Sequence, residues 1–445
     1  MSKKLIIIGL DCADPGLVFD RWKDQLPNLG HMIDNGISAR MRSTDPPITV
    51  PAWTAMTTGK DPGTLGIYGF RNRLNHDYDS LAFADATRVT EPRIWDILGK
   101  MGKKSIVIGV PQTYPPKPLN GIMVSGFLTP SKAHPFVYPA AFREKLDQVA
   151  PDYMLDVDNF RTGDKETVIK QVYRMTAERF KLMNHCIRNE KWDFLMMVEI
   201  GPDRLQHAFW AYMDPESPFY QPGHRFANVI FEYYRYLDHE IGKISDLIDG
   251  ETTLMIVSDH GAKAFHGGFC INEWLIGNGY LKVREYPAGP VPLAPENILW
   301  SETTAWGEGG YYARLNLNIA GREPEGIVTP TEADKLMEDL AQGLKKVSKG
   351  PVKIENQIHR PSDLYAQTNN IPPDLMLYPD NLNYRSIGGI GYNRLFTGGN
   401  DSGPDHANHD FYGIFIMHGP GIEPLSTDQI SIYQVAPKVL EIFGS

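Results

Sequence analysis

Asp and His side chains recur beside short apolar runs that have the composition of buried strands. They stand at four places: Asp11 after LIIIGL, Asp203 and His207 after DFLMMVEI, Asp259 and His260 after TLMIVS, and Asp405, His406, His409 and Asp410 just before GIFIMHG. In an open α/β sheet, ligands bind beyond the carboxyl ends of the strands, so these side chains are expected to gather at one edge of one sheet. Carboxylates and imidazoles together suit Zn²⁺ or Mn²⁺. The pattern therefore predicts a metal site.

A second interpretation stays open at this point, because Asp also favours helix caps and turns. Any one of these residues alone is explained by capping, and Asp203 and His207, four residues apart, could simply share a solvated helix face. The protein would then be a non-catalytic interaction protein. Four separate places with metal-ligand chemistry fit capping poorly, so metal binding is the favoured interpretation.

Thr49 is the candidate nucleophile. It lies in PPITVPAW, where the prolines on both sides restrict the backbone. A helix is expected to begin near Pro51, which places Thr49 just before a helix N-terminus, where an oxyanion or a phosphate is favoured. A hydroxyl becomes a good nucleophile when a divalent metal coordinates it. Taken by itself, however, Thr49 is better explained as the N-cap of that helix.

The elements that must position these residues alternate between strands and helices. Apolar runs typical of buried parallel strands cover residues 5–10, 105–110, 121–127, 193–200, 253–258 and 413–419. Helical patterns cover residues 164–189, 224–249, 335–346 and 430–443. This alternation predicts an α/β fold with a mostly parallel central sheet flanked by helices.

The segment 265–400 has a different composition, rich in Pro, Asn and Tyr, as in NNIPPDLMLYPDNLNYRS. We expect loops and short antiparallel strands there. The segment would form a smaller cap or substrate subdomain, inserted into an α/β catalytic core made of residues 1–264 and 401–445.

Charge and cysteine content restrict the kinds of partner. The chain of 445 residues has a net charge of −10 at pH 7, which argues against binding to duplex nucleic acid or to an anionic membrane surface. A small anionic substrate stays compatible, since a bound metal can invert the local charge. The three cysteines form no disulfide framework, and no targeting segment or membrane span is evident. We therefore expect a cytoplasmic protein, and the sequence leaves its oligomeric state open.

Five motifs in matching order resemble the alkaline phosphatase superfamily, and within it the type I phosphodiesterase/nucleotide pyrophosphatase family. They are IIIGLDCADP, ITVPAWTAMTTGKDPGTLGIYGF, EIGPDRLQH, VSDHGA and NHDFYGIFIMHGPGI, and together they span nearly the whole chain. One such motif is weak evidence of membership in a family, whereas five motifs in the same order are strong evidence. The resemblance implies an alkaline-phosphatase-like fold and a hydrolase of phosphate esters, in the first place a phosphodiesterase or nucleotide pyrophosphatase.

The resemblance also implies a role for each matching residue. Two divalent ions, Zn²⁺ or Mn²⁺, would be held by two sets of ligands: Asp203, His207 and His409 for one, and Asp11, Asp259, His260 and the Thr49 oxygen for the other. Thr49 would be the nucleophile and would carry a phospho-threonine intermediate. The substrate would be a small phosphate ester, with nucleotides among the candidates. A phosphomonoesterase or a phosphonate ester hydrolase of the same superfamily remains the alternative.

The sequence departs from the family at two positions. The usual glycine after the first Asp is Cys12, which we interpret as a small packed residue and not as a ligand. The Asn that nucleotide pyrophosphatases often carry downstream of the nucleophile falls near Phe70, where Arg71 or Asn72 could replace it. Trp53, Tyr68 and Phe70 flank the proposed nucleophile, and Tyr311 and Tyr312 follow a Gly-rich run that starts at Trp306. Some of these aromatic residues are expected to line a pocket for the leaving group; alternatively, they are ordinary core residues.

The motif DHANHDFYG offers two histidines for one ligand position. His409 is the expected ligand, because the family places its histidine a few residues before the final strand and because the sheet fixes the backbone there. His406 lies further out in a run rich in Gly and Asn. It is expected to donate a hydrogen bond to a carboxylate such as Asp203, or to be exposed.

Overall fold

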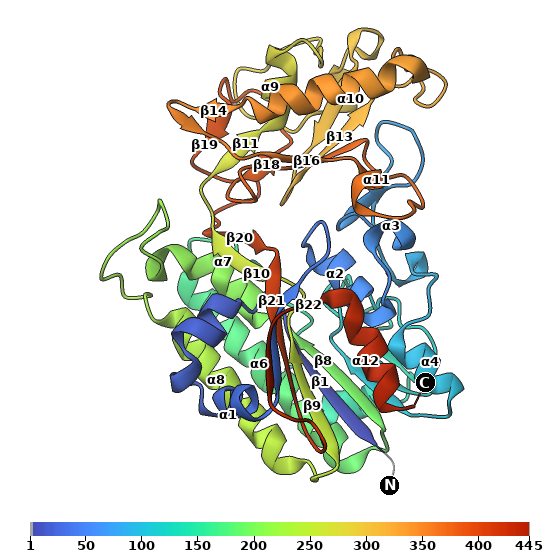
Figure 1. Ribbon diagram of the computed structural model, residues 1–445, viewed down its shortest axis with the longest axis vertical. Helices are drawn as coiled ribbons and strands as arrows, with labels where there is room; N and C mark the ends of the chain where they lie inside the picture. Colours follow the sequence, from blue (N-terminus) through green and yellow to red (C-terminus); the bar gives the residue numbers. More distant parts are fainter. Residues whose placement is uncertain (1–2, 445) are drawn as a thin grey trace.

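The computed structural model describes residues 3–444 and shows a larger and a smaller lobe stacked along the long axis of the molecule (Figure 1). The larger lobe contains a nine-stranded sheet in the order β22-β2-β21-β9-β1-β8-β5-β6-β7. Its strands are β1 (Lys4–Leu10), β2 (Ile37–Arg42), β5 (Ser105–Ile108), β6 (Gly121–Val124), β7 (Val137–Tyr138), β8 (Phe194–Glu199), β9 (Thr252–Val257), β21 (Tyr412–His418) and β22 (Leu425–Ser431). The predicted α/β fold with a mostly parallel central sheet is confirmed.

Strand β21 runs in the opposite direction to the parallel strands beside it. It pairs antiparallel with both β9 and β2, so the prediction of a parallel strand at residues 413–419 was wrong. The reversal matters for the site. The start of an antiparallel strand lies at the same edge of the sheet as the carboxyl ends of its parallel neighbours. The segment before β21 therefore meets the residues that follow β1, β8 and β9.

Both faces of the central sheet are covered by helices, which is why its strands are apolar throughout. In β1, Ile6, Ile8 and Leu10 pack on one side, whereas Leu5 and Ile7 pack on the other. The first face is covered by α1 (Pro27–Asn35), α5 (Phe142–Val149), α6 (Lys165–Asn189), α7 (Gly201–Met213) and α8 (Val229–Leu247). The second face is covered by α2 (Thr49–Thr58), α4 (Ile94–Lys100) and α12 (Val435–Ile442).

Helix boundaries follow capping more closely than hydrophobic pattern. The side chain of Asp164 caps α6 as its position suggests, by accepting a hydrogen bond from the Thr167 amide. The next predicted helix starts later, at Val229. Helix α10 (Pro330–Lys345) starts earlier than predicted because Thr329 and Glu332 form a capping box with Pro330 at the first position. The last helix is shorter, since Ile430 and Ser431 belong to the edge strand β22 and residues 432–434 form a 3₁₀ turn.

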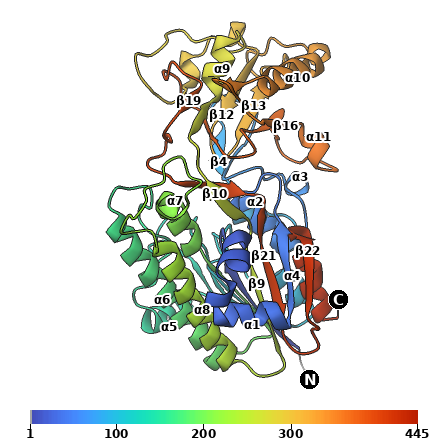
Figure 2. The same ribbon diagram turned by 60° about the vertical axis from the view of Figure 1, so that its left-hand side comes forward.

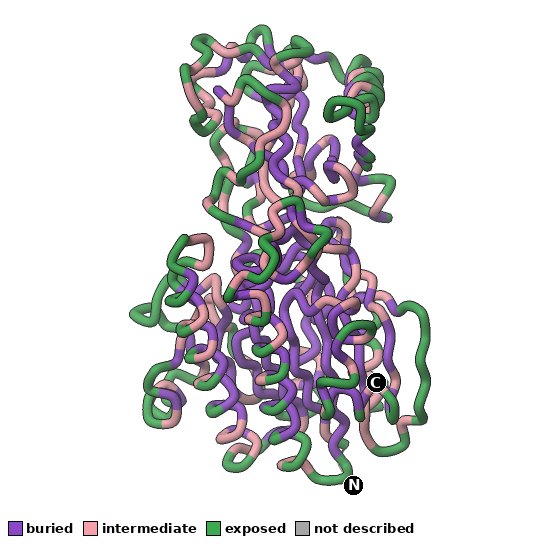
Figure 3. Tube along the Cα trace, turned by 90° about the vertical axis from the view of Figure 1, so that its left-hand side faces the viewer, coloured by how far each residue is buried: buried purple, intermediate pink, exposed green. Residues whose placement is uncertain are grey.

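The smaller lobe is built from short strands. One antiparallel sheet contains β12 (Ala305–Glu308), β13 (Ala313–Leu317), β17 (Leu375–Tyr378) and β16 (Gln357–His359), and a second contains β18 (Arg385–Ile387), β11 (Gly268–Cys270) and β19 (Phe396–Thr397). Helices α9 (Ile271–Gly277) and α10 pack on them around a separate core that includes Trp274 and Leu340. Figure 3 shows buried chain in both lobes. The boundaries at residues 265 and 400 stay our prediction for the division into core and cap.

Two short strands join the lobes where the site residues lie. Strand β10 (Gly261–Ala264) leads into the smaller lobe, and β20 (Ala407–Asp410) returns from it, paired antiparallel so that Ala262 faces His409. A hairpin of β3 (Arg71–Arg73) and β4 (Leu81–Phe83) lies near the same level (Figure 2). Among the described residues, no helix is long and apolar enough to span a membrane.

Candidate metal centre and active site

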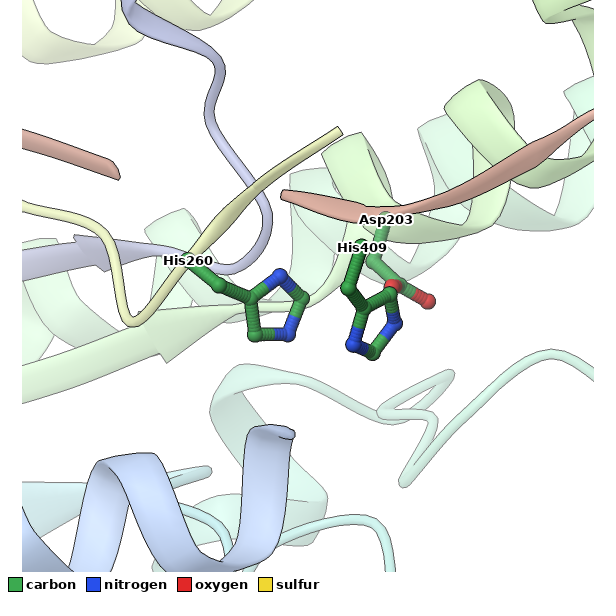
Figure 4. A group of neighbouring side chains, drawn as sticks. All are labelled: Asp203, His260 and His409. Carbon is green, nitrogen blue, oxygen red and sulfur yellow. The ribbon is translucent and has the colours of Figure 1, made fainter. Parts of the chain in front are cut away.

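The structure brings all seven residues predicted to bind metal into one buried cluster. They come from the ends of β1 and β9, the N-termini of α2 and α7, and strand β20, and each side chain belongs to a residue that is at most 3% exposed: Asp11, Thr49, Asp203, His207, Asp259, His260 and His409. Two groups have ligand atoms within 4.8 Å of one another: Asp203, His260 and His409, and Asp11, Asp259 and His260. Figure 4 shows the first group converging.

His260 belongs to both groups, whereas the prediction assigned it to the group of Asp11 and Asp259 alone. The predicted partners of Asp203 are also close, because Nε2 of His207 lies 3.3 Å from Oδ1 of Asp203 and 3.3 Å from Nε2 of His409. The ring of His260 stacks on that of His409 with centroids 3.7 Å apart. The two proposed sites therefore form one continuous centre.

Each histidine of the centre is held by its Nδ1 atom and directs Nε2 into the cluster. Nδ1 of His207 lies 2.7 Å from Oδ1 of Asp405, Nδ1 of His260 lies 3.1 Å from the Gly261 carbonyl, and Nδ1 of His409 lies 2.9 Å from the Pro47 carbonyl. An Nδ1–H donated to an oxygen leaves Nε2 free to bind a metal. Three rings oriented in the same way fit a metal centre better than they fit helix caps.

Carboxylate oxygens in the cluster lack the hydrogen bonds that buried oxygens normally accept. Among residues 3–444, Oδ1 of Asp11, Oδ1 of Asp203 and Oδ2 of Asp259 accept none. An unpaired buried carboxylate oxygen costs several kcal/mol unless a cation balances it. The residues present therefore fit divalent ions, as the donor chemistry of the sequence predicts.

The pKa shifts in the cluster show that its buried carboxylates favour a nearby positive charge. Burial, followed by the charges of Asp259 and Asp203, raises the pKa of Asp11 well above its usual range. Burial would lower the pKa of His260, but the Asp259 carboxylate raises it to about 9. In the same way, Asp405 raises the pKa of His207 to about 10 against the effect of burial. All three shifts favour the protonated form of the side chain when no metal ion is bound.

These raised pKa values predict how the stability of the metal-free protein changes with pH. Asp11 and His260 hold protons more tightly in the folded state than in the unfolded state, so the free energy of unfolding falls as pH rises between 6 and 9. His260 alone accounts for about 2–3 kcal/mol. For a chain of 445 residues this corresponds to a fall of roughly 2–4 °C in the melting temperature of EDTA-treated protein.

Bound cations would keep the carboxylates ionised, so the protein reloaded with Zn²⁺ or Mn²⁺ serves as the control in the same buffers. Its melting temperature should change far less over this range, and it should exceed that of the metal-free protein most at pH 9. A metal-free protein whose melting temperature stays level or rises with pH would contradict a cation site at the cluster.

Thr49 is the first residue of α2 and the N-cap is Ile48, so the helix begins two residues before Pro51, and Pro51 lies in its first turn. The Thr49 side chain does not cap the helix. Its Oγ1 instead lies 3.3 Å from Nε2 of His260, at the edge of the cluster. The hydroxyl thus combines a helix N-terminus, which favours negative charge, with contact to a candidate metal ligand.

The backbone conformation at Cys12 explains why the family usually has a glycine after the first Asp. Its φ is 64°, in the left-handed region that favours glycine. The amide of Cys12 donates to Oδ1 of Asp259 at 3.1 Å, and its Sγ donates to the Gly261 carbonyl at 3.3 Å. Burial, with the charges of Asp203 and Asp11, raises the pKa of the thiol well above its usual range. Cys12 is a packed residue in the structure, as predicted.

Asp405 and Arg204 support the centre. From the sequence, Arg204 had no predicted role, and Asp405 was named only as one of several side chains with metal-ligand chemistry. Asp405 holds the ring of His207 and also accepts hydrogen bonds from Arg161 and Arg385, both at 2.8 Å. Arg204 donates to Oδ2 of Asp203 at 2.5 Å. Both residues are adjacent in the sequence to candidate site residues, since Arg204 follows Asp203 and Asp405 precedes His406. Spacing alone does not reveal which side chains support the ligands.

His406 takes neither of its two expected positions. It is partly buried, and its ring packs edge-on against Tyr212, with centroids 5.1 Å apart. Among the described residues its Nδ1 has no hydrogen-bond partner. The carboxylate interaction expected of His406 is made by its neighbour Asp405, which faces the centre.

A cavity of about 390 Å³ lies beside the centre and contains only part of the predicted substrate-binding set. Phe70, Arg71, Tyr311 and Tyr312 line it. Tyr68 and Asn72 do not: the Tyr68 hydroxyl donates to the Asn369 carbonyl, and the Asn72 side chain is bonded within the turn formed by residues 68–72.

Trp53 is also a core residue. Its Nε1 donates to Oδ2 of Asp11 at 2.6 Å. By contrast, the ring of Tyr311 from the smaller lobe stacks on His409 with centroids 3.8 Å apart, so the smaller lobe contributes directly to the site.

Comparisons with known proteins identify the fold and the family. A comparison with curated proteins gave no match. Among solved structures, the human ectonucleotide pyrophosphatase/phosphodiesterase 5 matches with a TM-score of 0.57 and 12% identity, over 99% of this chain and 95% of that chain. The murine ectonucleotide pyrophosphatase/phosphodiesterase 5, solved as an inactive threonine-to-alanine variant in complex with AMP, matches with a TM-score of 0.55 and the same identity and coverage. At this identity the likeness concerns the fold.

The family follows from the sequence. The model of the family described as type I phosphodiesterase/nucleotide pyrophosphatase matches residues 5–411, which include every residue of the candidate metal centre. The chain therefore belongs to the type I phosphodiesterase/nucleotide pyrophosphatase family, an enzyme family of metal-dependent phosphoric ester hydrolases.

Proposed function

We propose that this protein is a phosphodiesterase that works with two divalent ions and uses Thr49 as its nucleophile, and that it acts on a small phosphate ester in the cytoplasm. One observation carries the proposal. The Thr49 hydroxyl does not cap its helix and instead faces a buried cluster of six carboxylate and imidazole side chains. A solvated surface or a set of helix caps would not have this geometry.

Two sets of residues would hold the ions. Asp203, His207 and His409 surround one position, Asp11 and Asp259 another, and His260 lies between them. When bound, the ions would lower the pKa of the nucleophile and neutralise charge on the phosphoryl oxygens. The shared position of His260 next to Thr49 suits this arrangement, because one ring contacts both the nucleophile and the ligands of each ion.

The residues of the chain define the chemical steps. Thr49 Oγ1 would displace one alcohol from phosphorus and give up its proton to solvent, while the departing oxygen gains one, which leaves an ester between Thr49 and the phosphoryl group. Water would then displace Thr49, release the phosphate product and restore the hydroxyl. The N-terminus of α2 favours the negative charge of the phosphoryl group throughout.

The murine neighbour supports the proposal, since it was solved as an inactive variant in which a threonine is replaced by alanine, with AMP bound. The location in the cytoplasm rests on the sequence, and the three buried and unpaired cysteines suit a reducing compartment.

Metal content and substrate preference test this function together. Purified protein should contain about two divalent ions per chain. It should hydrolyse bis(p-nitrophenyl) phosphate faster than p-nitrophenyl phosphate, lose this activity with EDTA, and regain it with Zn²⁺ or Mn²⁺. A protein without bound metal would overturn the proposal, whereas a preference for the monoester would replace it with the phosphomonoesterase alternative.

A further inference from the structure

The cavity beside the metal centre has an unusual lining. Five arginines line it together with several aromatic rings, and no Asp or Glu of residues 3–444 does: the arginines are Arg71, Arg161, Arg204, Arg314 and Arg385. Carboxylates behind the lining hold some of these guanidinium groups. Arg204 pairs with Asp156 at 2.6 Å, and Arg314 pairs with Glu308 at 2.8 Å.

The remaining positive charge is only partly balanced. Arg161 and Arg385 share the single carboxylate of Asp405, each at 2.8 Å. Arg385 is 5% exposed, and among the described residues its Nε atom has no hydrogen-bond partner, so a buried donor at the cavity is unsatisfied. These two arginines lie beside Tyr311, which stacks on His409, and therefore belong to the part of the cavity next to the metal centre.

Arg71 lies in a different setting. It is exposed on strand β3, and no carboxylate of the described residues pairs with it. Its guanidinium lies 4.6 Å from the ring centroid of Phe83, the residue opposite it in the hairpin. Phe83 also lines the cavity and is 55% exposed, which is unusual for a phenylalanine. The Arg314 guanidinium donates to the carbonyl of Arg71, so a second cation lies at the same place.

We infer that Arg71, stacked on Phe83, binds a second anionic group on the substrate, apart from the phosphodiester that reacts at the metal centre. This inference rests on the proposed function. A guanidinium without a carboxylate partner, beside an exposed aromatic ring and at a cavity without acidic residues, is suited to an organic ester group that carries a phosphate or a carboxylate. The substrate class is then a phosphodiester with one ester group that is both apolar and negatively charged.

Three chromogenic esters with the same leaving group test the inference: p-nitrophenyl benzyl phosphate, and its analogues with a carboxylate or a phosphate group on the benzyl ring. Wild-type protein loaded with metal should hydrolyse the charged esters with a kcat/KM roughly ten- to a hundredfold higher than that of the uncharged ester. A preference for one charged ester identifies the anion as phosphate or carboxylate. Equal rates for the two charged esters would mean that Arg71 binds either anion.

Arg71→Ala should reduce this ratio to near one, whereas Arg71→Lys, which keeps a point charge, should retain part of it. Arg235→Ala is the matched control. Arg235 is an exposed arginine on α8, paired with Glu232 and absent from the cavity, so its removal should leave the ratio at the wild-type value. Wild-type ratios near one, or an unchanged ratio in Arg71→Ala, would overturn the inference while the phosphodiesterase function stands. If wild-type protein hydrolysed none of the three esters, the proposed function would fail as well.

Discussion

Replacing Thr49 with alanine is expected to lower kcat for bis(p-nitrophenyl) phosphate by roughly 10⁴-fold or more, because the oxygen that would attack phosphorus is removed. The fold should survive the change. Thr49 occupies the first helical position without capping the helix, and alanine is well tolerated there. The melting temperature of the variant should therefore stay within a few degrees of the wild-type value, and its content of divalent ions should be nearly unchanged.

Thr49→Ser is the matched variant, since it keeps the oxygen and loses only a methyl group. It should retain activity within roughly a hundredfold of the wild-type protein. When the reaction with a phosphorus-labelled substrate is quenched with acid, both the serine variant and the wild-type protein should carry the label covalently. The alanine variant should show no label. Alanine and serine variants with equal activity would return Thr49 to a purely structural role.

The central sheet and the clustering of the candidate metal ligands could be predicted because each depends on local pattern. A strand buried on both faces must be apolar along its length, as β1 and β8 are. The side chains that follow such strands meet at one edge by topology, so Asp11, Asp203 and Asp259 could be placed without knowledge of any contact. The same reasoning failed for the direction of β21, since an apolar run carries no information about whether a strand is parallel or antiparallel.

The residues that support the site were beyond prediction because their roles depend on contacts between distant segments. Asp405 meets Arg161 across 244 positions in the sequence, and Tyr311 reaches His409 from the smaller lobe. The same limit applied to the pocket. Proximity in sequence to Thr49 suggested Trp53 and Tyr68, but both are core residues, whereas the hairpin residue Phe83 lines the cavity and was not considered.

His409→Ala is expected to remove about one divalent ion per chain and to lower activity by roughly 10³-fold. The Pro47 carbonyl holds Nδ1 of His409, and its Nε2 lies 3.3 Å from that of His207 and 3.5 Å from Oδ1 of Asp203. Two imidazole nitrogens and a carboxylate oxygen this close, with little hydrogen bonding among them, are best satisfied by a shared cation. Truncation removes one of the three donors and also the ring on which Tyr311 and His260 stack.

His406→Ala is the internal comparison, because His406 lies only three residues away and its ring packs on Tyr212, outside the ligand groups. It should keep both ions and most of the activity, with a modest loss of stability from the lost ring contact. Metal analysis and kcat on the same preparations separate the two variants. If the ion were lost from the His406 variant and kept in the His409 variant, the direction of the histidine rings in the centre would have to be reassigned. If both variants kept two ions, His409 would not be a metal ligand. Its role would then be to pack against the rings of His260 and Tyr311.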